Sequence, residues 1–511
     1  MFRFLRHKAL GDNYISEAAD DEQPSYSGCM VGTRVDILSK FVTWAKSDPV
    51  TIFWLAGMAG TGKTSIAVSL CRMLRRDPAV LLGGGYFCSR SAGSIARTDV
   101  RRILPTLAAL LADQSEEFAE ALAAELEKDR RVSHKPVSEQ IGPLLHRPLA
   151  VLRSLDRPLV FVIDALDECS NQRELAELLR IIVDLQCEAR VKFVLTSRPE
   201  IHIRGTPISN PTHNTILHLH TIDAETITSD IRLYISGTLE TTATEETWYT
   251  DDNIAALVSL CGGLFIFAST VLLYVLDPEE DEERRNRLLK VTSTAAKGSA
   301  ATTAIDQVYE LVLLEASRRD AVDSDELDQM RNILACIFQA RTLLSVEALA
   351  VLMDIRPSRL RALLRRLHSL VYMPMNDEEP GVRTLHASFG DYLQDRAPEH
   401  LRISVTLGHD VLARGCLRRL ARDDLRFNVS RSRSSFEPNP ETVPDFIEIS
   451  LIYACLHWAH HVDAASIRSA FDEDMLRVFR PKFLFWLEVL SVTNKIGVAS
   501  GLLRIAASAV S

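Results

Sequence analysis

The motif GxxxxGK[ST] constrains the fold of this 511-residue chain more than any other feature. The chain carries it in full as Gly57-Met58-Ala59-Gly60-Thr61-Gly62-Lys63-Thr64, between an apolar run and a helical pattern that begins at Ser65. Glycines let backbone N–H groups point inward around a phosphate, the lysine adds positive charge, and the Thr64 hydroxyl can bind Mg²⁺. A glycine-rich turn that only starts a helix is the alternative, and the preceding apolar run makes it the weaker one. The sequence therefore predicts a phosphate-binding loop over residues 57–65.

Short apolar runs alternate with helical stretches from residue 50 to about residue 222. The runs that suit buried parallel strands lie at 50–56, 84–89, 158–164, 191–197 and 214–220. This alternation predicts an α/β P-loop NTPase domain with a parallel sheet and helices on both faces.

Helical patterns replace the strands after residue 222. They lie at 224–239, 251–276, 306–317, 325–340, 345–353 and 358–370. The charged segment 278–290 and the small-residue segment 292–303 indicate a linker, and a loop is expected at 427–443. The last three helices and a following β-hairpin have the order of a winged helix.

Five segments follow from these patterns. We expect a disordered segment (1–27), a nucleotide-binding domain (28–221), a helical domain (222–298), a winged-helix domain (299–400) and a C-terminal helical domain (401–511).

Carboxylates follow the third apolar run. It ends at Asp164, and Asp167 and Glu168 lie one turn further on. Asp164 is placed to support a Mg²⁺ bound by Thr64, and Asp167 and Glu168 are placed to orient or deprotonate an attacking water. The alternative is a helix start capped by aspartate, but the upstream phosphate loop favours catalysis by these three carboxylates.

An arginine follows the fourth apolar run, in Thr196-Ser197-Arg198-Pro199. The strand ends of a P-loop sheet converge on the nucleotide, so Arg198 can detect a γ-phosphate through a charge-assisted hydrogen bond. The alternative is a surface arginine before a proline turn.

These motifs together resemble the fungal NACHT proteins, which are STAND-class NTPases related to NLR proteins. GMAGTGKTSIA, VFVIDALDEC and FVLTSRPE stand in the family's order, and CMVGTR, CGGLFIFAST, LSVEALAVLM and LHASFGDYL extend the likeness over roughly residues 28 to 510. The resemblance implies a cytoplasmic ATP/ADP switch that is closed with ADP, opens with ATP to self-associate or meet NLR-like partners, and hydrolyses ATP slowly. It also implies a role in non-self recognition or cell death.

The resemblance adds three nucleotide contacts. Thr33 and Arg34 belong to the short motif that precedes the domain, and His386 is the position expected to reach the ADP β-phosphate. Taken alone, a histidine at a strand end is more often a packed or surface residue.

Two departures from the family pattern are visible. Gly263-Leu264-Phe265 lacks the proline that packs on adenine in related ATPases, so a preference for adenine rests on the resemblance alone. Neither a C-terminal repeat sensor nor an N-terminal effector domain is evident, so we expect a minimal or truncated member that signals through partners.

Composition excludes several other classes. The net charge of −10 disfavours nucleic acid as a partner, and the longest apolar run, 264–276, is too short for a membrane helix. Nine cysteines without a CxxC pair indicate reduced thiols.

Two weaker patterns remain. An arginine-rich helix after Pro357 could bind DNA or form an ordinary charged face. The group Cys455, His457, His460 and His461 lacks a second ligand pair for a metal.

Overall fold

The computed structural model describes most of the chain. The described residues are 28–47, 50–89, 98–152, 156–184, 191–200, 203, 206, 208, 214–241, 248–295, 301–318, 324–374, 381–432, 439 and 446–510. The predicted disordered segment 1–27 and the tip of the predicted hairpin lie outside them. The chain forms two compact units, the first ending at Val308 and the second beginning at Tyr309.

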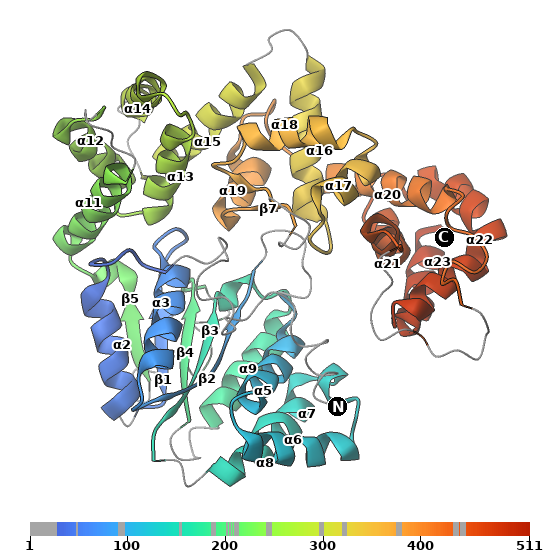
Figure 1. Ribbon diagram of the computed structural model, residues 1–511, viewed down its shortest axis with the longest axis horizontal. Helices are drawn as coiled ribbons and strands as arrows, with labels where there is room; N and C mark the ends of the chain where they lie inside the picture. Colours follow the sequence, from blue (N-terminus) through green and yellow to red (C-terminus); the bar gives the residue numbers. More distant parts are fainter. Residues whose placement is uncertain are drawn as a thin grey trace. The chain divides into compact units, whose positions relative to one another are not determined.

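A five-stranded parallel sheet forms the centre of the first unit (Figure 1). Its strands are β1 (Ile52–Ala56), β2 (Leu81–Phe87), β3 (Leu159–Asp164), β4 (Val191–Ser197) and β5 (Thr215–His218). All five predicted strands are present, in the spatial order β2-β3-β4-β1-β5. Strand β4 therefore lies between the strand before the phosphate loop and the strand that ends at Asp164.

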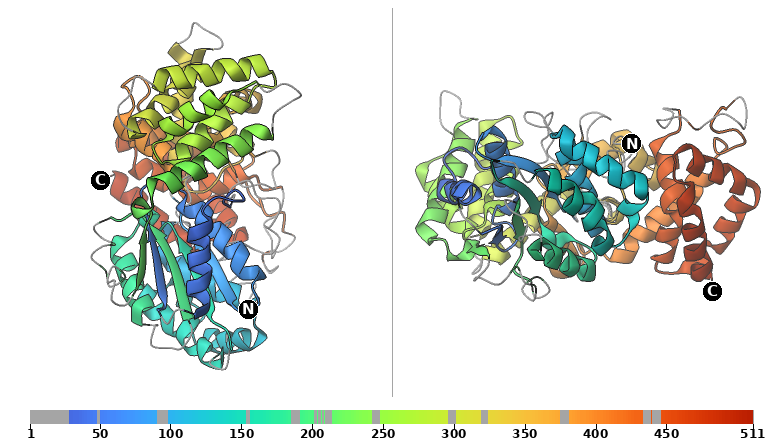
Figure 2. Two further views of the ribbon diagram at one scale, coloured as in Figure 1. Left: turned by 90° about the vertical axis from the view of Figure 1, so that its left-hand side faces the viewer. Right: turned by 90° about the horizontal axis from the view of Figure 1, so that it is seen from below.

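Helices cover both faces of this sheet, as predicted (Figure 2). On one face, α2 (Val35–Ser47) and α3 (Lys63–Arg76) pack on Phe53, Leu55 and other residues that point to that side. The opposite face, which includes Trp54, shares one apolar core with α5 (Ile103–Ala112), α6 (Glu116–Lys128), α7 (Val137–Ile141), α8 (Arg147–Leu149) and α9 (Gln172–Asp184). Successive strand residues point to opposite faces, so apolar runs without alternation bury both sides.

The rest of the first unit is helical, and here two expectations were wrong. The single helix expected over 251–276 is two helices, α12 (Asp251–Cys261) and α13 (Phe265–Leu276), because Gly262 and Gly263 adopt φ values of 52° and 83°. Left-handed glycines end helices, whereas the apolar pattern runs on across them. Helix α11 (Ala224–Glu240) precedes α12 in the chain.

The expected linker is largely helical. Helix α14 (Asp281–Ala295) takes in most of the charged segment and the start of the small-residue segment. Leu288 and Val291 are buried, and Arg287 donates to the Tyr274 carbonyl and pairs with Asp277. The charged segment therefore forms a helix that packs on its neighbours along one side, which composition alone did not reveal.

The second unit is mainly helical. After α15 (Ala301–Arg318), which crosses the division, come α16 (Ser324–Gln339), α17 (Val346–Met353) and α18 (Pro357–Arg366), and then the antiparallel pair β6 (Val371–Tyr372) and β7 (Arg383–Thr384). The predicted order of three helices and a hairpin is present. The short α19 (Ala387–Asp391) and four longer helices follow: α20 (Val405–Ala421), α21 (Ile449–Asp463), α22 (Asp472–Val492) and α23 (Ala499–Val510). None of the helices in the described ranges combines the length and apolarity needed to cross a membrane.

Candidate nucleotide-binding site

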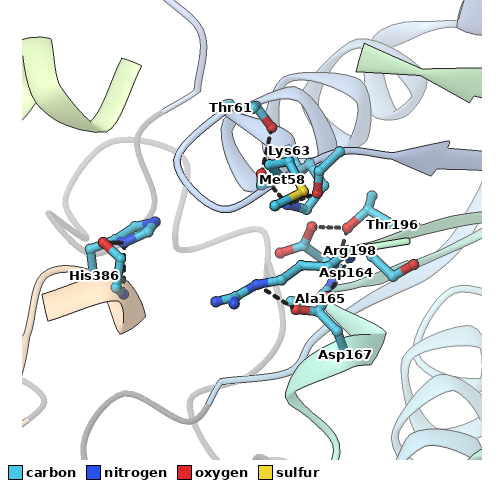
Figure 3. A network of polar contacts seen from close by, with 12 residues as sticks. Met58, Thr61, Lys63, Asp164, Ala165, Asp167, Thr196, Arg198 and His386 are labelled. Atoms are coloured by element: carbon cyan, nitrogen blue, oxygen red, sulfur yellow. Dashed lines mark hydrogen bonds and ion pairs between the residues drawn. The ribbon is translucent and has the colours of Figure 1, made fainter. Parts of the chain in front are cut away.

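The phosphate loop connects β1 to α3, as its motif predicts. Gly60 and Gly62 have φ values of 77° and 88°, in the left-handed region that glycine tolerates. The Lys63 ammonium lies across the loop and donates to the carbonyl oxygens of Gly57 at 2.8 Å and Met58 at 2.9 Å (Figure 3). Burial lowers the pKa of Lys63, while the negative charges of nearby carboxylates oppose this shift. A desolvated cation held at such a loop is suited to meet phosphate oxygens.

Two neighbouring segments hold the loop. The Gly57 amide donates to the Ser197 carbonyl at 3.1 Å, and the Gly60 carbonyl accepts from the Ile266 amide at 3.1 Å. A Cβ placed on Gly60 would lie only 2.2 Å from Ile266 Cγ2. The loop is thereby fixed to the end of β4 and to the start of α13, and position 60 has room only for glycine.

Asp164 meets the phosphate loop through Thr64. The Thr64 hydroxyl donates to Asp164 Oδ2 at 2.7 Å, and the Thr196 hydroxyl donates to the other carboxylate oxygen. Burial raises the pKa of Asp164, while these two hydrogen bonds and the charge of Lys63 oppose the rise. Hydroxyl and carboxylate oxygens are the ligands that Mg²⁺ prefers, so this donor set fits the predicted metal.

Asp167 is held by Arg198. Its carboxylate accepts from the Arg198 amide at 2.8 Å and forms an ion pair with the guanidinium at 3.1 Å (Figure 3). Asp167 is 4% exposed and Arg198 is 26% exposed. The preceding Ala165 adopts a left-handed φ of 56°, which directs the short turn that carries Asp167 and Glu168. The two predicted functions, water activation and γ-phosphate detection, therefore belong to residues in direct contact.

The segment before α2 also reaches the loop. Arg34 donates to the Thr61 carbonyl at 3.0 Å, lies over the Phe265 ring at 4.7 Å and pairs with Asp230 at 3.8 Å. Burial lowers the pKa of Arg34, and Asp230 opposes this shift. Thr33 closes a turn by donating to the Met30 carbonyl at 2.8 Å. Arg34 thus lies at the phosphate loop, whereas Thr33 is part of the turn that places it.

Sequence reasoning missed several residues of this site. Thr196 and Ser197 carried a usable signal, because polar side chains at the end of a buried strand need partners, and both are fully buried. Trp54, in the first predicted strand, lies in the core, and it also donates to the Ser197 hydroxyl at 2.8 Å. Asp230 contacts Arg34 and Ile266 contacts the loop, and no local pattern indicates either contact.

His386 belongs to the second unit, where it caps α19. Its Nδ1 accepts from the Ser388 amide at 3.0 Å and contacts the Ser388 hydroxyl at 2.6 Å. That hydroxyl also contacts Tyr309 at 2.9 Å. An Nδ1 that accepts a hydrogen bond leaves the proton of a neutral ring on Nε2. The contact between His386 and a β-phosphate stays a prediction.

The arginine-rich helix α18 is partly paired within its own unit. Arg366 pairs with Glu326 at 2.8 Å, Arg361 pairs with Glu347, and Arg359 donates to Gln329 at 2.7 Å. These contacts favour the ordinary charged face over a DNA-recognition helix.

The histidines of α21 form a separate cluster. His461 contacts Tyr453 at 2.8 Å and His409 at 2.9 Å. Within the described part of the chain, no group of three or more histidine, cysteine or acidic side chains is arranged to hold a metal ion.

One family model matches the part of the chain that contains this site. The family model described as nephrocystin 3, N-terminal, matches residues 32–198, a segment that contains the phosphate loop, the acidic turn and Arg198. This segment is therefore similar to that family. No curated protein matches the chain at a significant level.

Several solved structures have a weak similarity to this chain. A STAND protein with a tetratricopeptide repeat sensor from Pyrococcus horikoshii is 14% identical with a TM-score of 0.46, over 96% of this chain and 59% of that protein. Cdc6p from Pyrobaculum aerophilum is 11% identical with a TM-score of 0.33, over 78% of this chain and 98% of that one. A Walker-type ATPase of Pyrococcus abyssi is 15% identical with a TM-score of 0.32, over 73% of this chain and 98% of that one. These TM-scores are too low to indicate a shared function. The chain spans less than two thirds of the length of the STAND protein.

Proposed function

We propose that the chain is a STAND-class P-loop NTPase of the NACHT type. It is closed with ADP, opens with ATP to self-associate or meet NLR-like partners, and hydrolyses ATP slowly. Its place in fungal non-self recognition or cell-death signalling, and its cytoplasmic location, are parts of this proposal that come from the motif resemblance.

The contact between Thr64 and Asp164 carries the nucleotide part of the proposal. The two residues are 100 positions apart in the sequence, but the Thr64 hydroxyl lies 2.7 Å from Asp164 Oδ2. The Lys63 ammonium spans the phosphate loop beside them. An ammonium, a hydroxyl and a carboxylate around one glycine-rich loop are the groups that a nucleoside triphosphate with Mg²⁺ requires. A bound Mg²⁺ would offset the charge of the phosphates. Glu168, which follows Asp167 on the same short turn, is the residue we propose to orient the attacking water.

The pair formed by Arg198 and Asp167 bears on switching. A γ-phosphate that attracts the Arg198 guanidinium competes with Asp167 for it. The contact therefore contributes less binding free energy than it would with an unpaired arginine. Complete switching from 1:99 to 99:1 needs ~5.5 kcal/mol of differential affinity. One charged hydrogen bond contributes roughly 1.5–3 kcal/mol, so loss of a His386 contact or a partner must supply the remainder.

Identification of the bound nucleotide tests this proposal. The purified chain is denatured and the released nucleotide is identified and counted; we expect ADP in stoichiometric amount. Lys63→Ala removes the ammonium at the loop and should abolish retention. Lys128→Ala is the matched control, because that lysine is 66% exposed on α6. Absence of nucleotide from the unaltered chain, with no change of mass on addition of ATP and Mg²⁺, would contradict the proposal.

A second candidate is a scaffold that binds nucleotide without turnover. The ion pair that holds Asp167 favours it, because the Arg198 guanidinium occupies a carboxylate oxygen that would otherwise be open to the attacking water. Retention of nucleotide with no phosphate release from ATP would select this candidate over a slow ATPase.

A further inference from the structure

Two thiols meet beside the candidate site. The Sγ atoms of Cys88 and Cys169 lie 3.4 Å apart, and the side chains are only 4% and 3% exposed. Both cysteines are free, and of the cysteines in the described part of the chain these two alone have a sulfur–sulfur contact. A disulfide bond is about 2.05 Å long, so the sulfurs need to approach by only about 1.4 Å.

The pair joins two segments that border Asp164. Cys88 directly follows β2, and its amide donates to the Asp164 carbonyl at 3.1 Å. Cys169 directly follows Glu168, and its amide donates to the Leu166 carbonyl at 3.2 Å. A bond between these sulfurs would therefore attach the acidic turn, residues 165–169, to the end of the neighbouring strand.

We propose that Cys88 and Cys169 are a modification site, at which a peroxide produces a reversible disulfide that restrains the acidic turn and slows ATP hydrolysis. The effect on hydrolysis rests on the proposed function; the formation of the bond does not.

The chemistry balances with hydrogen peroxide as the oxidant. One thiol loses its proton and attacks a peroxide oxygen, which gives a sulfenic acid and hydroxide. The other thiol then loses its proton and attacks the sulfenic sulfur, the S–S bond forms and hydroxide leaves. Overall the two thiols lose two electrons and two protons, and the peroxide becomes two molecules of water. A thiol reductant reverses the reaction by exchange.

The expected effect follows from the position of Glu168. Because Cys169 is its neighbour, the approach of the sulfurs shifts the turn that carries its carboxylate. A displacement of about 1 Å at a reacting group can lower a rate by about a hundredfold, so we expect a loss of tenfold or more. The phosphate loop is not part of the bridge, so nucleotide retention should stay the same.

Peptide mapping of the full chain tests the bond. The reduced protein is treated with hydrogen peroxide and digested without reductant; we expect a linked peptide pair that contains Cys88 and Cys169 and disappears on reduction. Cys88→Ser and Cys169→Ser should each abolish the pair. Cys261→Ser is the control, because Cys261 is equally buried and has no thiol contact among the described residues.

ATP turnover is measured on the same samples before and after treatment. Recovery of both thiols unchanged, or their capture in other products, would overturn the site. If the cross-link forms but ATP turnover does not fall, and peroxide leaves turnover equally unchanged in the Cys88→Ser and Cys169→Ser variants, the effect on hydrolysis would be overturned. If the reduced chain does not hydrolyse ATP at all, the effect on hydrolysis fails together with the proposed ATPase, whereas the peptide map still decides whether the bond forms.

Discussion

At the scale of single residues, the site depends on the hydrogen bonds that the buried Asp164 carboxylate accepts. Asp164 is 1% exposed, and each of its oxygens accepts from a hydroxyl, one from the phosphate loop and one from β4. Thr196 also accepts from the Ala165 amide at 3.0 Å, so it links the carboxylate to the strained start of the acidic turn. A buried charge without such partners would be costly.

Replacement of Thr196 by valine tests this link. Thr196→Val keeps the shape of the side chain but leaves one Asp164 oxygen and the Ala165 amide unsatisfied, which should destabilise the protein by about 2–4 kcal/mol. Thr196→Ser keeps the hydroxyl and should cost less than about 1.5 kcal/mol. Urea unfolding of the two variants measures the difference, and equal losses would show that the hydroxyl is unimportant.

At the scale of elements, the strands and the phosphate loop were predictable because local patterns encode them. Apolar runs without alternation indicate strands buried on both faces, and the glycines of the loop are needed at fixed places. The position of β4 between β1 and β3 was not predictable, because strand order depends on long-range pairing. The same holds for the ion pair of Arg34 with Asp230, whose partners lie 196 residues apart. The break between α12 and α13 had a signal in Gly262 and Gly263, which the continuous apolar pattern concealed.

The contact between the phosphate loop and α13 gives a prediction at this scale. Gly60→Ala places a methyl group against Ile266 and also strains a left-handed backbone, at a cost of roughly 1–2 kcal/mol for the strain alone. We expect nucleotide affinity to fall at least about tenfold, since 1.4 kcal/mol corresponds to that factor. Titration with a fluorescent nucleotide measures it.

The double variant Gly60→Ala, Ile266→Ala separates the two causes. Removal of the Ile266 side chain relieves the clash but not the strain, so affinity should recover in part. No recovery at all would mean that the loop and α13 do not interact in this way. Ile266→Ala alone is the reference for the loss of packing.

At the scale of the whole molecule, different chemistry should affect the stability of the two units. In the proposed function a nucleotide binds the first unit and stabilises it by mass action, about 2.7 kcal/mol at a hundred times the dissociation constant. The second unit instead contains histidines that burial keeps neutral. Burial and the charge of Arg341 lower the pKa of His457 to about 3 and that of His460 to about 4. Neither ring nitrogen of His457 has a hydrogen-bond partner among the described residues.

Acid should therefore weaken the second unit through His457. In the unfolded chain this ring gains a proton near pH 6.5, whereas in the folded chain it stays neutral to a much lower pH, so stability is present above about 6.5 and is lost as the pH falls. Between about pH 7.5 and about pH 5.5 the loss from this ring is about 1.4 kcal/mol.

The variant His457→Leu removes the titrating ring, so urea unfolding of the full chain should show a smaller loss on acidification than in the unaltered chain. His400→Leu, at an exposed position, is the control and should keep the full pH dependence. The proposed nucleotide site lies in the first unit and His457 lies in the second, so excess ADP with Mg²⁺ should not remove the difference between the His457 variant and the unaltered chain. A pH dependence that is the same in all three proteins would contradict a neutral, buried His457.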